Sequence, residues 1–218
     1  MSPTQGASEL LPEAERWRIV QRFQEYQGEL SANVLRAFGV LAFYVVELVN
    51  FHGLSLGPVA LAPVEGVDRQ VHLAITALAV AWVALAGGVL LLLRAKVFPA
   101  GLKFGTTAAD VVLLTCMLVV VDGPKSTLSI GYFLVITLAV LRFSPRLVGF
   151  ATAGAIAGYS FVVGNALLFR PTLKLLPYQE FMFVLALLLV GVILSRATRQ
   201  AHRAAAHLVA FSAPVEPS

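Results

Sequence analysis

Residues 72–93 read HLAITALAVAWVALAGGVLLLL, a stretch of 22 residues without a single Asp, Glu, Lys or Arg. A helix that crosses the roughly 30 Å of hydrocarbon in a bilayer needs about 20 mostly apolar residues. This stretch therefore predicts a membrane-spanning helix.

The composition of the whole chain agrees with this prediction. Of its 218 residues 58% are hydrophobic and only 13% are charged. A soluble domain is about one quarter charged, and the charged residues here are too few to cover a water-facing surface. An ordinary soluble enzyme is thereby excluded. The single cysteine, Cys116, also excludes a scaffold held by internal disulfides.

Further apolar stretches on both sides of residues 72–93 predict an all-α polytopic integral membrane protein. We expect a six-helix transmembrane bundle over residues 35–195, with spans at 35–52, 72–93, 103–121, 127–142, 147–168 and 178–195. The fourth span is the shortest, and a re-entrant fourth segment would leave five. Residues 1–34 and 196–218 flank the bundle as an N-terminal region and a basic tail.

The distribution of Lys and Arg predicts the orientation, because cytoplasmic connections retain positive charge. Twelve of the 16 fall on the side of the two termini: Arg16, Arg18, Arg22, Arg36, Arg94, Lys96, Lys103, Arg142, Arg146, Arg196, Arg199 and Arg203. The other side carries four: Arg69, Lys125, Arg170 and Lys174. We therefore expect an integral protein of the cell (bacterial inner) membrane with both termini in the cytoplasm. The net charge of +4 then reflects topology, with no nucleic-acid partner expected.

The N-terminal region contains an amphipathic helix. Ile19, Phe23, Tyr26 and Leu30 recur at the spacing of one helix face. Such a helix either lies on the cytoplasmic leaflet and leads into the first span, which we favour, or docks a partner protein. The Ala-rich stretch 196–211 is expected to extend the last span as a basic helix.

Two carboxylates fall inside predicted spans, where a charge costs roughly 2.5–3.5 kcal/mol and calls for a partner or a role. Asp110 lies in the third span and Glu47 in the first, both near the midplane. They are candidates to face one another or a shared polar cavity. Alternatively, Asp110 is neutral and hydrogen-bonds Thr106, Thr107 or a neighbouring helix.

A second set of polar residues gathers at the outer ends of the spans: Asn50, His52, His72, Asp122, Asn165, Tyr178 and Glu180. Their convergence predicts a small-molecule pocket open to the outside, although helix ends are also polar simply because they meet water. The four histidines have no paired-ligand spacing, so neither a metal nor another cofactor is expected.

Small residues mark a close helix contact in the fifth span. Gly154 and Gly158 are four residues apart, a spacing that lets helices approach closely in lipid. We favour packing within the chain over a homodimer. The sequence contains none of the common nucleophile, P-loop, dinucleotide or metalloprotease motifs. We therefore expect no enzyme activity.

The stretch 110–159, DVVLLTCMLVVVDGPKSTLSIGYFLVITLAVLRFSPRLVGFATAGAIAGY, carries an intramembrane Asp, a following Thr, a Gly-containing outer hairpin with a Ser, and an apolar helix that ends in an Arg. It resembles the six-helix N-terminal membrane modules of bacterial sensor histidine kinases and of some membrane-bound nucleotide cyclases. The hairpin here has Asp122, Gly123 and Pro124 where those families commonly have paired glycines. The resemblance implies a receptor or regulatory region, with Asp110 at the matching polar position.

No kinase or cyclase domain follows Phe211 in this sequence. The resemblance therefore implies a free-standing, non-catalytic module that signals through a cytoplasmic or membrane protein partner. Two alternatives stay open: a small proton- or ion-coupled transporter or channel that uses Glu47 and Asp110, and a structural or assembly subunit of a membrane complex.

Overall fold

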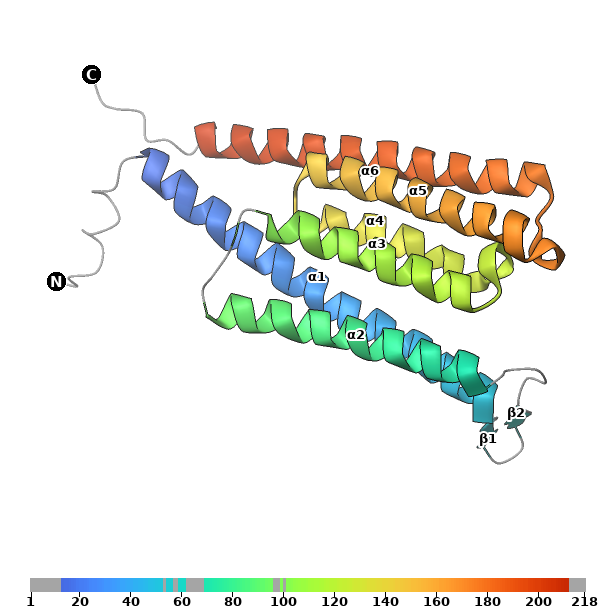
Figure 1. Ribbon diagram of the computed structural model, residues 1–218. Helices are drawn as coiled ribbons and strands as arrows, with labels where there is room; N and C mark the ends of the chain where they lie inside the picture. Colours follow the sequence, from blue (N-terminus) through green and yellow to red (C-terminus); the bar gives the residue numbers. More distant parts are fainter. Residues whose placement is uncertain are drawn as a thin grey trace, which may run out of the picture.

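The structure is a computed structural model that describes residues 13–52, 54–56, 59–61, 69–95, 99 and 101–211, with side chains from 26 to 204 apart from 50, 53–68, 96–98, 100 and 202. Six α-helices make up nearly all of this described part (Figure 1). They are α1 Glu13–His52, α2 Arg69–Arg94, α3 Leu102–Val120, α4 Gly131–Val140, α5 Pro145–Phe169 and α6 Pro177–Phe211. Two short strands, β1 Leu54–Leu56 and β2 Val59–Leu61, pair antiparallel between α1 and α2.

The prediction of an all-α bundle of long apolar helices is confirmed for five helices. Within the described residues, five helices are long and apolar enough to cross a bilayer: Tyr26–Val49, Arg69–Arg94, Leu102–Val120, Pro145–Phe169 and Pro177–Ala201. The fourth predicted span is a shorter apolar helix, Thr127–Val140, which joins the 3-10 helix η2 Thr127–Ile130 to α4. At 1.5 Å per residue its 14 residues reach roughly 21 Å, less than the hydrocarbon thickness.

The exposed surface of the bundle is apolar. Large hydrophobic side chains are exposed on several helices, among them Phe38, Leu73, Leu91, Phe161, Phe181 and Ile193. A soluble monomer rarely exposes apolar surface on this scale. Together with the apolar helices, this surface indicates a membrane-embedded protein.

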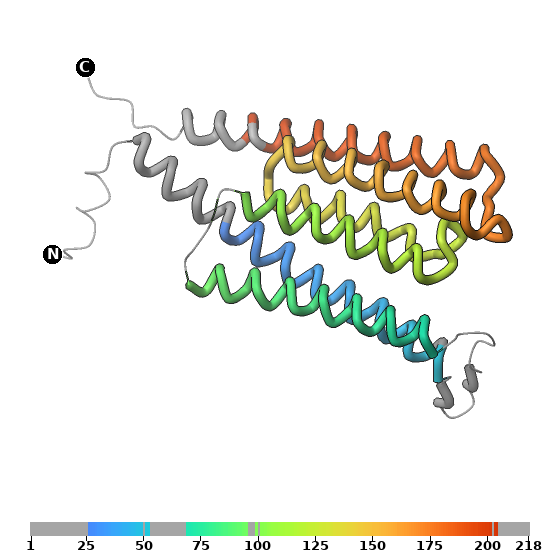
Figure 2. The backbone as a smooth tube through the Cα atoms, viewed as in Figure 1, coloured from blue at the N-terminus to red at the C-terminus, as the bar shows by residue number. Residues whose placement is uncertain are grey.

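The helices form two groups that meet along α3. α1 packs on α2, and α2 on α3, while α5 contacts α3, α4 and α6 (Figure 1). The first residues of α1 and the last of α6 lie at the same end of the bundle, and the β1–β2 hairpin lies at the other. In the tube view the α1–α2 pair inclines away from α3–α6 toward the hairpin end (Figure 2).

Prolines and one glycine set the turns between the helices. Pro145 and Pro177 are the first residues of α5 and α6, positions where the missing N–H costs nothing. Gly123 opens the 3-10 helix η1 Gly123–Lys125 with φ of +57°, a left-handed conformation that favours glycine. Lys125 Nζ donates to the Thr172 carbonyl at 2.8 Å and ties this turn to the 3-10 helix η3 Pro171–Leu173.

Both terminal helices run without a break past the predicted span limits. α1 is continuous across residues 34 and 35, where we expected an interfacial helix to lead into the first span. Gly28 and Glu29 are already buried in the bundle, whereas the side chains of Ile19 and Phe23 lie outside the described residues. The prediction that α6 continues as a helix over 196–211 is confirmed.

Candidate functional site

Asp110 lies at the centre of a buried polar network. The Arg36 guanidinium donates to both of its carboxylate oxygens, from Nε to Oδ1 at 2.8 Å and from NH2 to Oδ2 at 3.0 Å. Trp82 Nε1 donates to the same Oδ1 at 2.8 Å. The exposed fractions of Asp110 and Arg36 are both 2%. Asp110 is therefore held by α1 and α2 at once, through a bidentate ion pair and an indole hydrogen bond.

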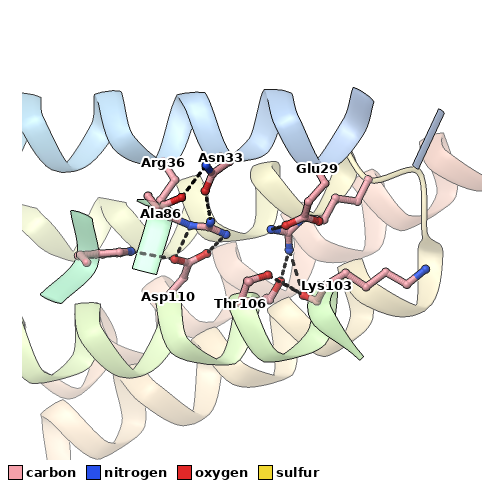
Figure 3. Close-up of polar contacts among 10 residues, drawn as sticks. Glu29, Asn33, Arg36, Ala86, Lys103, Thr106 and Asp110 are labelled. Atoms are coloured by element: carbon pink, nitrogen blue, oxygen red, sulfur yellow. Dashed lines mark hydrogen bonds and ion pairs between the residues drawn. The ribbon is translucent and has the colours of Figure 1, made fainter. Parts of the chain in front are cut away.

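Helix periodicity explains why α1 can supply this network. Glu29, Asn33 and Arg36 are spaced i, i+4 and i+7, so they lie along one face of α1 opposite α3 (Figure 3). Asn33 Oδ1 accepts from Arg36 NH1 at 2.8 Å, and Asn33 Nδ2 donates to the Ala86 carbonyl of α2 at 2.9 Å. Asn33 thus orients the guanidinium and joins α1 to α2.

A second buried ion pair lies about two turns away along α1. Arg142 NH2 donates to Glu29 Oε1 at 2.8 Å, and Arg142 NH1 donates to Thr107 Oγ1 at 2.6 Å and to the Lys103 carbonyl at 3.0 Å. Arg142 follows the end of α4, so this side chain ties α1, α3 and the α4–α5 connection together. Lys103, Thr107 and Asp110 repeat on α3 the i, i+4, i+7 spacing found on α1.

The two pairs balance in charge. Glu29 and Asp110 supply two carboxylates and Arg36 and Arg142 two guanidinium groups, and none of the four is more than 4% exposed. Ion pairs buried in this way are costly to break, because removal of one partner leaves an uncompensated charge at a cost of about 3–5 kcal/mol. The network therefore fixes how α1, α2 and α3 pack.

The expected contact between Asp110 and Glu47 is not found. Arg36 and Glu47 are 11 residues apart on α1, or roughly 16 Å along its axis, and Asp110 pairs with Arg36. Thr106 and Thr107 also differ from expectation: their hydroxyls donate to the Lys103 carbonyl at 3.3 and 2.8 Å instead of to Asp110. Of the partners expected for Asp110, the neighbouring helices are the ones found, through Arg36 of α1 and Trp82 of α2.

A cavity of about 490 Å³ lies between the α1–α2 pair and α3, toward the hairpin end of the bundle. Its volume is within the range of small-molecule sites. Most of its lining is apolar, with Phe43, Tyr44 and Trp82 as aromatic walls. Polar groups come from Glu47, Asp122 and residues 125–127 of the α3–α4 turn. We refer to it as the end cavity.

One carboxylate oxygen of Glu47 lacks a hydrogen bond to any described residue. Its Oε1 is buried and lies 3.6 Å from Nδ1 of His72, which is itself buried and without a partner. The His72 ring stacks on Phe51 with centroids 4.0 Å apart, and the His52 ring lies edge-on 6.0 Å from His72. The rim near Glu47 is thus an aromatic and imidazole cluster.

The outer-end candidates separate into two groups. Asp122 lines the end cavity, His72 lies beside Glu47 of that cavity, and the His52 ring lies next to His72. Asn165, Tyr178 and Glu180 belong to α5 and α6 and are not among its lining residues. The side chain of Asn50 lies outside the described residues. The described residues therefore do not form a single pocket that contains all seven.

Trp82 connects the end cavity to the buried network. It is one of the residues that line the cavity, and its indole N–H donates to Asp110 Oδ1. Trp82 also borders a small void of about 20 Å³, together with Arg36, Asp110 and Gly39. A molecule in the cavity would thus contact the side chain that positions Asp110.

Gly154 and Gly158 face α3 within the same chain. A Cβ on Gly154 would lie 3.3 Å from Val111, and one on Gly158 would lie 2.6 Å from Thr115 Oγ1. Thr115 and Tyr132 share a hydroxyl hydrogen bond of 2.8 Å at this point. In the described structure, these glycines therefore allow α5 to approach α3 closely.

The sequence offered signals for the network that composition alone does not reveal. Trp82 is one of two tryptophans and sits within a predicted span. The sequence also contains the i, i+4, i+7 spacing of Glu29, Asn33 and Arg36. Arg36 and Arg142, however, were counted only among the positive charges that predict the orientation of the chain. Because both side chains are buried, they are not exposed charges of the loops that the orientation rule counts.

Among the described residues, no group of three or more His, Cys, Asp and Glu side chains is placed to hold a metal ion. Comparison with protein-family models, with curated proteins and with solved structures finds no match to this chain.

Proposed function

We propose that this chain is a receptor-like membrane module without catalysis of its own, which binds a small ligand in the end cavity and signals through a partner protein. The observation that carries the proposal is the dual contact of Trp82. Its ring lines the cavity while its indole N–H holds Asp110, the partner of Arg36 on α1. Occupancy of the cavity is thereby linked to the position of α1.

The length of the terminal helices supports an output at the opposite end. α1 has 40 residues and α6 has 35, about 60 and 52 Å at 1.5 Å per residue. Both exceed the hydrocarbon thickness by more than about 20 Å. Since α1 begins and α6 ends at the same end of the bundle (Figure 1), both extend toward the same side.

We place this end in the cytoplasm of the cell, with the short helix Thr127–Val140 as a sixth crossing. Ten Lys and Arg residues remain on this side after the buried Arg36 and Arg142 are set aside, against four on the other. The resemblance of residues 110–159 to sensor membrane modules fits this orientation. A cytoplasmic or membrane protein partner would then contact the projecting helices.

A transporter has less support. Both carboxylate oxygens of Asp110 are engaged by Arg36 and Trp82. The void next to Asp110 is about 20 Å³, room for one water molecule at most. An ion path past Asp110 would require this ion pair to open.

A tethered occupant tests the coupling without knowledge of the ligand. In a Cys116→Ser background, Thr127→Cys places a thiol on the cavity wall, and benzyl methanethiosulfonate then fills the cavity with a benzyl group. We expect benzylation to change amide hydrogen exchange in residues 28–36 of α1. The same change should be absent when Trp82→Phe is added.

Tyr178→Cys provides the control, since Tyr178 is 61% exposed and lies outside the cavity. Benzylation there should leave exchange in residues 28–36 unchanged. If benzylation through Thr127→Cys also leaves it unchanged, the proposed coupling is wrong.

A further inference from the structure

The end cavity has an excess of negative charge at its polar lining. Glu47 and Asp122 contribute carboxylates, and Lys125 is the one basic residue among its described lining. The Lys125 ammonium donates to the Thr172 carbonyl at 2.8 Å, so it is already engaged at η3. The cavity is therefore electrostatically suited to a cation.

Glu47 supplies an acceptor that the protein itself does not use. Its buried Oε1 has no hydrogen-bond partner among the described residues, and the 3.6 Å to His72 Nδ1 exceeds hydrogen-bond distance. A buried carboxylate oxygen without a donor is unfavourable, which favours a ligand that brings a donor.

Aromatic rings surround the same space. Phe43, Tyr44 and Trp82 line the cavity, and the Tyr44 hydroxyl is held by Thr76 Oγ1 at 3.2 Å. The faces of such rings attract cations, while their area accommodates an apolar body. An anion or a strongly hydrated metal ion would gain little from this lining.

From these contacts we infer that the end cavity binds a small organic ammonium ion with an apolar body, whose N–H donates to Glu47. This inference rests on the proposed function in that the cavity is the receptor site. It adds the chemical class of the ligand. The volume of about 490 Å³ is ample for an aromatic or branched alkyl amine.

Three probes share a phenyl group and differ in the charge of the end group: 2-phenylethylamine, 2-phenylethanol and phenylacetate. Their affinities separate the contribution of charge from that of hydrophobic contact. With Trp17→Phe, Trp82 is the only tryptophan, so its emission reports on the cavity wall. Titrations in detergent at about pH 8 keep the amine charged and an ordinary histidine neutral. We expect the amine to bind about tenfold to hundredfold more tightly than the alcohol, as for a charge-assisted hydrogen bond.

Glu47→Gln removes the charge at nearly constant shape, and Glu180→Gln is the matched control outside the cavity lining. The amine preference should disappear with Glu47→Gln and persist with Glu180→Gln. Equal binding of amine and alcohol, or a preference unaffected by Glu47→Gln, would overturn the inference. Such a result leaves the benzylation experiment, which carries no charge, as a separate test of the receptor function.

Discussion

Trp82 Nε1 lies 2.8 Å from Asp110 Oδ1, the oxygen to which Arg36 Nε also donates at 2.8 Å. This shared acceptor joins α2, α3 and α1 at one atom. Trp82 also lines the end cavity, and a rotation of its ring would change the hydrogen bonding of Asp110 directly, because the indole N–H donates to it.

Asp110→Asn leaves the Arg36 guanidinium buried without a counter-charge. We expect a loss of about 3–5 kcal/mol in the free energy of unfolding, measured by SDS titration in mixed micelles. The apolar double variant Arg36→Met with Asp110→Leu should recover most of this loss, since replacement of a buried pair by apolar groups is often neutral. If the loss of unfolding free energy in the double variant equals the sum of the losses in the two single variants, the pairing is contradicted.

Arg142→Lys should destabilise the second pair although the charge is kept. Arg142 bonds to Glu29, Thr107 and the Lys103 carbonyl through two nitrogens, a fork that an ammonium does not reproduce. We expect a loss of about 1.5–3 kcal/mol in the same unfolding assay. Arg146→Lys, at an exposed position four residues on, should change stability by less than about 0.5 kcal/mol. Equal effects of the two substitutions would argue against the network.

Trp82→Phe removes the indole donor and keeps an aromatic ring in the cavity wall. Loss of a hydrogen bond to a charged acceptor should cost about 1.5–3 kcal/mol in unfolding free energy. With Asp110→Asn already present, the same substitution should cost clearly less, because the charged acceptor has gone. A double-mutant cycle measures this difference, and additive effects would show that the two side chains do not interact.

Gly158→Ala should destabilise the bundle, whereas Gly164→Ala on the same helix should not. A Cβ at Gly158 would lie 2.6 Å from Thr115 Oγ1 and 2.9 Å from the Tyr132 hydroxyl, while one at Gly164 has nothing within 4 Å. We expect a loss of about 1–3 kcal/mol at Gly158, as for overpacking. At Gly164 we expect no loss or a gain of up to about 1 kcal/mol from helix propensity. Thermal unfolding in detergent compares the two variants, and equal midpoints would contradict the close approach of α5 to α3.

The apolar helices were predictable because each depends on a local run of residues. Residues 72–93, for example, lie within α2. The fourth span was harder to bound, since the Ser126 hydroxyl accepts from Leu128 N and caps a 3-10 turn that takes up the start of the apolar stretch. Sequence periodicity does not separate such a turn from the first turn of an α-helix.

The ion pairs were not predictable in the same way. Arg36 and Asp110 are 74 residues apart, and Glu29 and Arg142 are 113 apart. Their meeting depends on which faces of α1, α3 and α4 pack together, and a count of charges by loop contains no such information. Glu47 was identified as a polar residue inside the first span, but its place in the end cavity depends on residues of α2, α3 and the α3–α4 turn that pack around it.

The most direct test of the account follows the Trp82 indole N–H by ¹H–¹⁵N NMR. With Trp17→Phe the spectrum contains a single indole resonance, and Asp110→Asn identifies the position of that resonance when the charged acceptor is lost. Benzylation through Thr127→Cys, in the Cys116→Ser background, should move the resonance toward that position and speed its exchange with deuterated water. A resonance and an exchange rate that stay unchanged when the cavity is filled would contradict the claim that Trp82 links the cavity to Asp110.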